Sequence, residues 1–175
     1  MSKVFCVVRA VKEKSLADCV SSLERLGFNY RILKGDSSLE LKVKRTLEIG
    51  KEKAKDYDWV MAVDADVIIN RKVEWVENYC EQTEETNEDL FSFTAWLDCT
   101  ERGLIDGLHL YKTSKCEGAL SIIKGEDFSW HKGREEYEIC QFLKKYQGFD
   151  TGRGIIREMF GTHLFYINNK GIISR

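Results

Sequence analysis

Short apolar runs alternate with amphipathic segments through residues 3–63, and this alternation restricts the fold more than any other feature. The runs Lys3–Val8, Phe28–Leu33 and Trp59–Val63 have the length and apolar content of strands. A helix beginning at Ser15 and a longer one from Leu39 to Lys55 lie between them. This order predicts a parallel sheet with crossover helices, and the nearly continuous apolar runs predict strands buried on both faces. We therefore expect an α/β fold.

The residues at the ends of the first helix fit known helix signals. Ser15 and Asp18 have the spacing of a capping box, with Asp in place of Glu. Gly27 is well placed to end the helix. The second helix should pack on the sheet through one side, because its many Lys and Glu residues lie mostly on the other. The packing side carries Leu39, Val43, Leu47, Gly50 and Ala54.

Weaker patterns follow in the rest of the chain. The stretch Glu81–Asp89 is acidic, and we interpret it as a solvated surface loop. No proline, repeat or linker divides the 175 residues, so we expect a single domain over 1–175. The further predicted elements are helices at Val73–Glu81, Cys116–Ile123 and Glu135–Tyr146, strands at Leu90–Leu97 and Leu108–Tyr111, and one or two strands within Met159–Ile173.

Charge, hydropathy and cysteine spacing exclude several classes of protein. The formal net charge of -2 argues against a protein that mainly binds the nucleic acid backbone. No segment approaches the ~20 apolar residues that span a bilayer, and the first apolar run is too short for a signal peptide. The six cysteines show no CxxC spacing. We therefore expect a cytoplasmic protein with reduced, mostly buried thiols and no membrane insertion.

The most informative motif is Asp64-Ala65-Asp66, which directly follows the third apolar strand. In open α/β sheets, ligands bind outside the carboxyl ends of the strands. Two carboxylates so close together repel each other unless a cation neutralises them, and Mg²⁺ or Mn²⁺ shared with substrate phosphates is a natural partner. The alternative is a strand-end turn with two solvated aspartates.

This arrangement resembles GT-A-type glycosyltransferases, and the run before it is similar in spacing to family-2-like members. That run contains Arg45-Thr46, Gly50, Ala54 and Tyr57, with Thr46 where the family usually has Asn. The resemblance implies a Rossmann-like GT-A fold, with a mixed, mostly parallel sheet flanked by helices. Residues 1–70 would form the nucleotide-binding half, which ends in the Asp-Ala-Asp motif, and residues 90–175 the acceptor-side half.

The resemblance also implies roles for residues around the motif. Asp64-Ala65-Asp66 would bind a nucleotide sugar, with a UDP-sugar as the expected donor; Asp64 would lie near the ribose and the metal, and Asp66 would bind the metal. Arg9 and Asp36 follow the first and second predicted strands, in loops that line the nucleotide in the family. Arg9 is equally compatible with a solvated loop charge, and Asp36 with an Asx turn. Arg45 is placed near donor phosphate or on a solvated helix face.

A second acidic motif opens the predicted helix Glu135–Tyr146. It is similar to the family's Glu-Asp motif, in which the second acid is the catalytic base, and Glu136 has that position. At 100° per residue, Glu135 and Glu136 border the apolar stripe of this helix and are directed toward the protein body. An ionised carboxylate there suits deprotonation of an acceptor hydroxyl. First-turn acids favoured by the helix dipole are the alternative, and Asp127 is the rival base.

His163 is the candidate for a third metal ligand beside Asp64 and Asp66. Several GT-A enzymes supply such a histidine near the end of the domain, and imidazole is a workable ligand for Mn²⁺. A structural histidine is the alternative. His109, within a predicted strand, is interpreted as a satisfied histidine of the sheet.

Taken together, the motifs predict a metal-dependent glycosyltransferase that moves a sugar from a nucleoside-diphosphate sugar to a carbohydrate or other hydroxyl acceptor, with inversion if the base lies opposite the leaving group. A nucleotidyltransferase and a catalytically silent nucleotide-sugar-binding or scaffold domain are the alternatives. The length of 175 residues leaves little room for an acceptor-recognition lobe.

Overall fold

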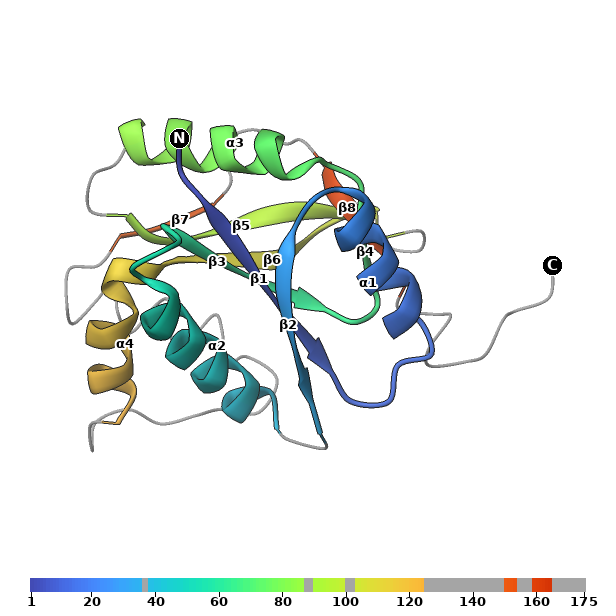
Figure 1. The fold of residues 1–175 in the computed structure, drawn as a ribbon, viewed down its shortest axis with the longest axis horizontal. Helices are drawn as coiled ribbons and strands as arrows, with labels where there is room; N and C mark the ends of the chain where they lie inside the picture. The colour runs from blue at the N-terminus through green and yellow to red at the C-terminus, as the bar shows by residue number, and fades with distance from the viewer. Residues whose placement is uncertain (36–37, 87–89, 100–102, 125–149, 154–158, 165–175) are drawn as a thin grey trace, which may run out of the picture.

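One mixed sheet with helices on both faces forms the part of the chain that the structure, a computed structural model, describes: residues 1–35, 38–86, 90–99, 103–124, 150–153 and 159–164 (Figure 1). Its strands are β1 (Val4–Ala10), β2 (Asn29–Lys34), β3 (Trp59–Asp64), β4 (Val67–Ile69), β5 (Leu90–Cys99), β6 (Gly103–Lys112), β7 (Asp150–Arg153) and β8 (Met159–His163). Its helices are α1 (Leu16–Arg25), α2 (Leu39–Lys53), α3 (Val73–Thr86), α4 (Cys116–Ile123) and a short 3₁₀-helix, Thr113–Lys115.

The strand order confirms the predicted mixed α/β sheet. Along the sheet the order is β2-β1-β3-β6-β5-β8-β4, and β7 pairs with β5. β1 runs parallel to β2 and β3, as the strand and helix alternation predicts. The second half introduces the antiparallel pairs β3–β6, β5–β6 and β4–β8, while β7 and β8 run parallel to β5. The carboxyl ends of β1, β2 and β3 therefore meet at one edge, called here the carboxyl edge.

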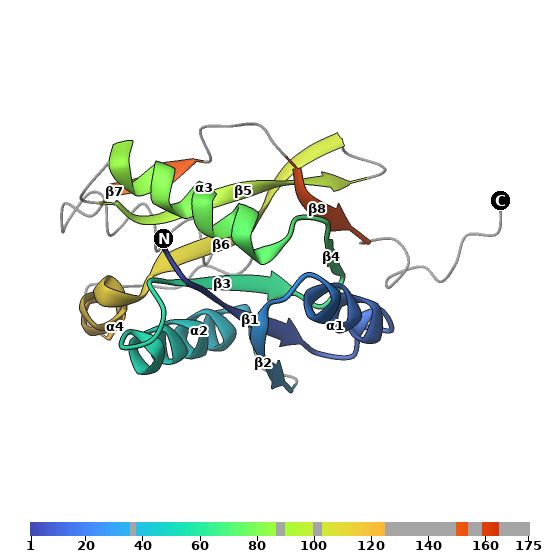
Figure 2. The same cartoon turned by 45° about the horizontal axis from the view of Figure 1, so that its top comes forward.

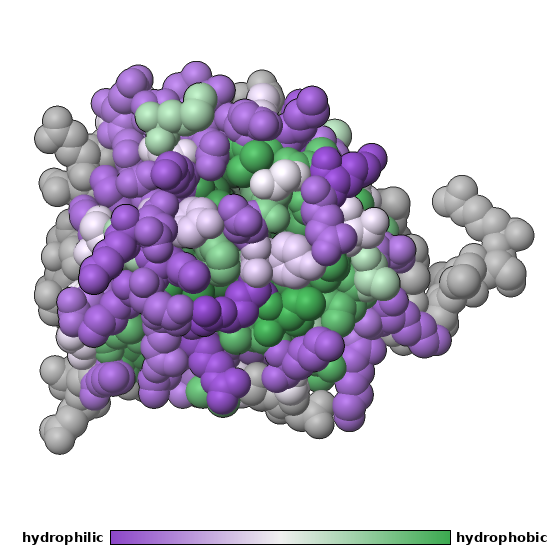
Figure 3. All heavy atoms as spheres, viewed as in Figure 1, coloured by the Kyte–Doolittle hydropathy of each residue, from purple (hydrophilic) through white to green (hydrophobic). Residues whose placement is uncertain are grey.

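The helices bury both faces of this sheet. Cys19 of α1 and Val76 of α3 join the core on one face. Val43 of α2 and Ala119 of α4 join the core on the other, and α2 and α4 lie side by side there (Figure 2). The surface seen in Figure 3 is mainly hydrophilic, with apolar area near the edge strand β2. Among the described residues, none of the helices has both the length and the apolar character that crossing a bilayer requires.

Several predicted boundaries are confirmed and two predictions are wrong. α4 has its predicted bounds, and Gly27 adopts φ 85°, the left-handed conformation that ends a helix. The predicted acidic loop is wrong over Glu81–Thr86, because these residues continue α3. Thr83 is buried there, so one side of the acidic turn belongs to the core. The capping box is also wrong, because the Ser15 side chain makes no cap hydrogen bond.

Strand β4 is one of the elements that the sequence analysis did not predict, as are β7 and the 3₁₀-helix. Only Ala65 and Asp66 separate it from β3, so the chain turns directly after Asp64 and pairs antiparallel with β8. The two strands approach closely at Gly161, where a Cβ would clash with the backbone oxygen of Ile68. This close pairing carries His163 to the turn between β3 and β4.

Candidate functional site at the carboxyl edge

Parallel pairing of β1 with β3 brings Arg9 opposite Asp64 at the carboxyl edge. The Arg9 Nε lies 2.8 Å from the Asp64 Oδ1. Arg9 is 1% exposed and Asp64 35% exposed, so a buried guanidinium holds a partly accessible carboxylate. The prediction that Arg9 follows the first strand is wrong: it lies within β1, and it is not a solvated loop charge. An arginine beside a carboxylate fixes its orientation through charge-assisted hydrogen bonds.

Three hydrogen bonds hold the backbone of the turn Asp64-Ala65-Asp66 in place. The Ala65 N–H donates to the Arg9 carbonyl oxygen at 3.1 Å, and the Leu164 N–H donates to the Asp66 carbonyl oxygen at 2.7 Å. The Ser15 hydroxyl donates to the Ala65 carbonyl oxygen at 2.9 Å. Ser15 therefore connects the start of α1 to the turn instead of capping the helix. Such supports hold a site in one geometry before a ligand arrives.

The second acid of the motif has a different partner. His163 Nε2 lies 3.6 Å from Asp66 Oδ1, and the side chains are 14% and 15% exposed. Burial raises the pKa of Asp66, while the neighbouring His163 opposes that shift and Asp64 adds to it. A bound cation would stabilise the ionised form of a carboxylate whose charge is disfavoured in this way.

The Asp66 and His163 donors fit a divalent metal. Two atoms that ligate one ion at about 2.1 Å lie ~3.0 Å apart at neighbouring octahedral positions and ~3.4 Å apart at tetrahedral ones. The 3.6 Å between Asp66 Oδ1 and His163 Nε2 is slightly longer, so a small side-chain rotation would bring both atoms to ligand distance. Within the described ranges, no group of three or more His, Cys, Asp and Glu side chains gathers closely enough to hold a metal. Arg9 holds Asp64 through Oδ1, and the role of Asp64 as a further ligand stays a prediction.

The structure does not test the remaining predicted site residues. Arg45 is exposed on α2, and its contact with donor phosphate stays a prediction. Asp36, Asp127 and Glu136, together with the predicted helix Glu135–Tyr146, lie outside the described residues, and their roles also stay predictions.

Two residues near the edge were missed or misassigned by the sequence analysis. Ser15 was interpreted as a helix cap, although its hydroxyl supports Ala65. Lys42 was not singled out, because the sequence analysis placed the Lys and Glu residues of this helix mostly on its solvated side, but it is 8% exposed. The signal available in the sequence was its spacing, because residues four apart, such as Lys42 and Thr46, share one side of a helix. In the structure, Thr46 is fully buried and donates its hydroxyl to the Lys42 carbonyl oxygen at 2.8 Å.

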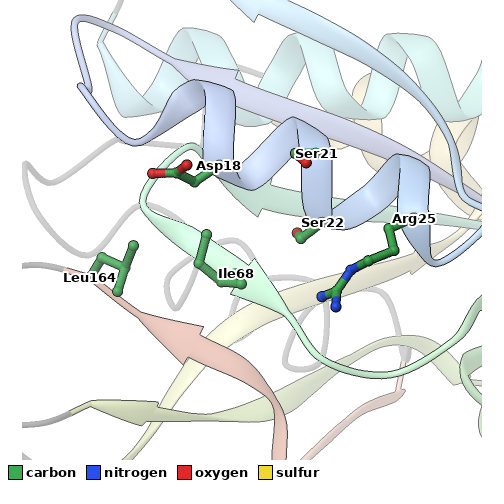
Figure 4. A pocket seen from close by; sticks show the side chains of 6 residues that line it. All are labelled: Asp18, Ser21, Ser22, Arg25, Ile68 and Leu164. Carbon is green, nitrogen blue, oxygen red and sulfur yellow. The ribbon is translucent and has the colours of Figure 1, made fainter.

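A hollow of about 300 Å³ lies between α1 and β4 (Figure 4). It is lined by Asp18, Ser21, Ser22 and Arg25 of α1, Ile68 of β4, and Leu164. Arg9 and Asp64, by contrast, continue the alternate positions of β1 and β3 whose side chains pack against α2. The hollow and the Arg9–Asp64 pair therefore lie on opposite faces of the sheet.

Comparison with known proteins identifies the fold but no family. No protein-family model matches the chain, and no curated protein matches it. A crystal structure of a protein from STIV matches with a TM-score of 0.55 and 16% identity, over 78% of this chain and 76% of that one.

Two further structures have transferase titles. A glycosyltransferase involved in the glycosylation of the major capsid of PBCV-1 matches with a TM-score of 0.51 and 11% identity, over 86% of this chain and 81% of that one. A cytidylyltransferase from Leptospira borgpetersenii serovar Hardjo-bovis matches with a TM-score of 0.52 and 11% identity, over 94% and 83%. At these identities the likeness concerns the backbone arrangement. The chain therefore has the mixed α/β fold of these glycosyltransferase and cytidylyltransferase structures.

Proposed function

We propose that this protein is a metal-dependent glycosyltransferase that moves a sugar from a nucleoside-diphosphate sugar to a hydroxyl acceptor. The observation that carries the proposal is the pair of contacts at the carboxyl edge, the ion pair of Arg9 with Asp64 and the approach of His163 to Asp66. They lie at the strand ends where α/β sheets bind ligands. The likeness in fold to a capsid glycosyltransferase supports the same function.

Each pair has its own part in donor binding. Asp66 and His163 would hold Mn²⁺ or Mg²⁺, which supplies positive charge for the leaving diphosphate. Arg9 orients the Asp64 carboxylate, which is accessible enough to accept hydrogen bonds from the ribose hydroxyls. The Ser15 hydroxyl keeps the intervening peptide in place, so the two carboxylates keep their separate directions.

Sugar transfer also needs a base of the protein that deprotonates the acceptor. A carboxylate, Glu136 or alternatively Asp127, would take the proton from the acceptor hydroxyl as its oxygen bonds to the anomeric carbon and the bond from that carbon to the diphosphate breaks. A base opposite the leaving group gives inversion at that carbon. The acceptor is expected to be a carbohydrate or another hydroxyl compound.

Nucleotidyl transfer is the second candidate, favoured by the likeness in fold to a cytidylyltransferase. Both reactions begin with a nucleotide at the carboxyl edge, but their products differ. A glycosyltransferase releases a nucleoside diphosphate, whereas a nucleotidyltransferase releases pyrophosphate from a nucleoside triphosphate. A catalytically silent nucleotide-sugar-binding domain would release neither.

The test is a screen of nucleotide sugars with Mn²⁺, in which the released nucleoside diphosphate is measured, and a parallel screen of CTP and UTP with sugar phosphates, in which pyrophosphate is measured. We expect diphosphate release that EDTA stops and that Asp66→Asn removes. The matched control is Asp56→Asn, because Asp56 is exposed just before β3, at the opposite end of that strand. Pyrophosphate release alone would favour the second candidate, and binding without turnover the silent domain.

A further inference from the structure

Lys42 is a buried lysine whose charge has no partner among the residues that the structure describes. The charged side chains that are buried among the described residues are Arg9 and Lys42, at 1% and 8% exposure. Arg9 is paired with Asp64. The Lys42 ammonium makes no hydrogen bond or ion pair with the described residues, yet it is not one of the side-chain atoms that are fully closed to solvent. An unpaired buried charge destabilises the folded protein, so a lysine of this kind points to a function.

The packing of α2 on β3 places Lys42 level with the Asp64 carboxylate. Gly50 fixes the register, because a Cβ on it would lie 2.9 Å from Val60 Cγ1. From Gly50 back to Lys42, eight residues of helix rise about 12 Å toward the carboxyl edge. From Val60 forward to Asp64, four residues of strand rise about 13 Å in the same direction.

Lys42 and Asp64 also share a face of the sheet. Val60 and Ala62 of β3 pack in the core beneath α2, and Asp64 continues the same alternation. Phe5 and Val7 of β1 belong to that core as well, and Arg9 follows them in register opposite Asp64. Arg9, Asp64 and Lys42 therefore surround the carboxyl edge on the side of α2.

We propose that Lys42 binds a phosphate group of the nucleotide donor, an inference that rests on the proposed function. Arg9 is neutralised by Asp64, so Lys42 carries the one uncompensated charge among these three side chains. A phosphate oxygen would give the ammonium the anionic partner that none of the described residues supplies. In this arrangement Lys42, rather than the exposed Arg45 one turn further on, is the α2 residue that contacts the donor.

Calorimetric titration with UDP and uridine, and with CDP and cytidine, in EDTA tests the assignment without the contribution of a metal. The variant is Lys42→Met, which keeps the length of the side chain and removes its charge. We expect the preference of the wild-type protein for the diphosphate over its nucleoside to fall by about 10- to 100-fold. Nucleoside affinity and the melting temperature should not fall. Lys44→Met is the matched control on the same helix and should keep the full preference.

The outcomes separate this inference from the proposed function. If wild-type protein prefers diphosphates and Lys42→Met keeps that preference, the role of Lys42 is overturned and the proposed function stands. If Lys42→Met lowers the melting temperature and weakens diphosphate and nucleoside equally, Lys42 is structural and the inference is also overturned. If wild-type protein shows no preference for a diphosphate over its nucleoside in EDTA, the inference fails, whereas the proposed function fails only if the screen of nucleotide sugars with Mn²⁺ also releases no nucleoside diphosphate.

Discussion

The Asp66 carboxylate has opposite effects on stability and on function. Burial raises its pKa, so the ionised form is disfavoured in the folded protein without a cation. Asp66→Asn removes that charge and keeps the size of the side chain. We expect the metal-free variant to melt at the same temperature as wild type or up to about 4 °C higher. Mn²⁺ should raise the melting temperature of wild type and leave that of the variant unchanged.

Thermal melts with and without MnCl₂ check this expectation. Asp56→Asn, at an exposed position, should respond to Mn²⁺ like wild type. Equal stabilisation of Asp66→Asn by Mn²⁺ would show that the ion binds elsewhere.

A double-mutant cycle on Arg9 and Asp64 measures the support behind the first acid. The two side chains meet at 2.8 Å and one of them is buried, so their removal should not be additive. We expect Arg9→Met and Asp64→Ala each to destabilise the protein, with a coupling energy of about 1–3 kcal/mol in urea unfolding. A coupling below about 0.5 kcal/mol would mean that the ion pair adds nothing to folding.

At the level of single residues, the sequence predicts the two acids of the site but not the side chains that they contact. Asp64 and Asp66 can be predicted because an apolar strand precedes them. The pairing of Arg9 with Asp64 depends on the register of two strands that are 55 residues apart in the chain. The role of Ser15 depends on a contact across 50 residues, and a local capping pattern predicts the wrong partner for its hydroxyl.

Among the elements, the β4–β8 pair controls the position of His163. Gly161 allows the two strands to approach, and a methyl group there would meet the Ile68 backbone, which cannot move away cheaply. We expect Gly161→Ala to destabilise the protein by about 2 kcal/mol or more. It should also weaken Mn²⁺ binding, because His163 is displaced from Asp66. Urea unfolding and a Mn²⁺ titration followed by melting temperature measure both effects.

Thr162→Ala is the matched control, since it changes the neighbouring residue without placing new atoms between the strands. It should keep most of the stability and the response to Mn²⁺. If Gly161→Ala behaves like this control, the close approach of β4 and β8 is not what positions His163.

The elements show why periodicity succeeds in one half of the chain and fails in parts of the other. Strands β1 and β3 are buried on both faces, so their apolar runs are unmistakable. β4 has three residues, which is too short for any period to appear. The end of α3 is acidic on its solvent side, and its burial depends on Thr83 and on tertiary packing that composition does not reveal.

Across the whole molecule, four buried thiols should make stability depend on alkaline pH. Cys6, Cys19, Cys80 and Cys116 are free and buried, which confirms the expectation of reduced core thiols at these positions. Burial alone raises the pKa of Cys116 from 9.0 to about 12. Below pH 9 this thiol is protonated in both the folded and the unfolded state, so stability is unaffected there. Between about pH 9 and 12 the unfolded chain alone loses the proton, so folding stability falls as pH rises.

Cys116→Ala isolates this contribution from the other groups that titrate at high pH. Between pH 7 and 10, wild type should lose roughly 1.4 kcal/mol more unfolding free energy than Cys116→Ala. The variant starts from a lower value at pH 7, because Cys116 packs against Gly50 between α2 and α4 and its removal leaves a small cavity. The prediction therefore concerns the difference in slope. Parallel pH profiles of unfolding in urea would show that this thiol ionises in the folded protein, and that α4 does not shield it from water.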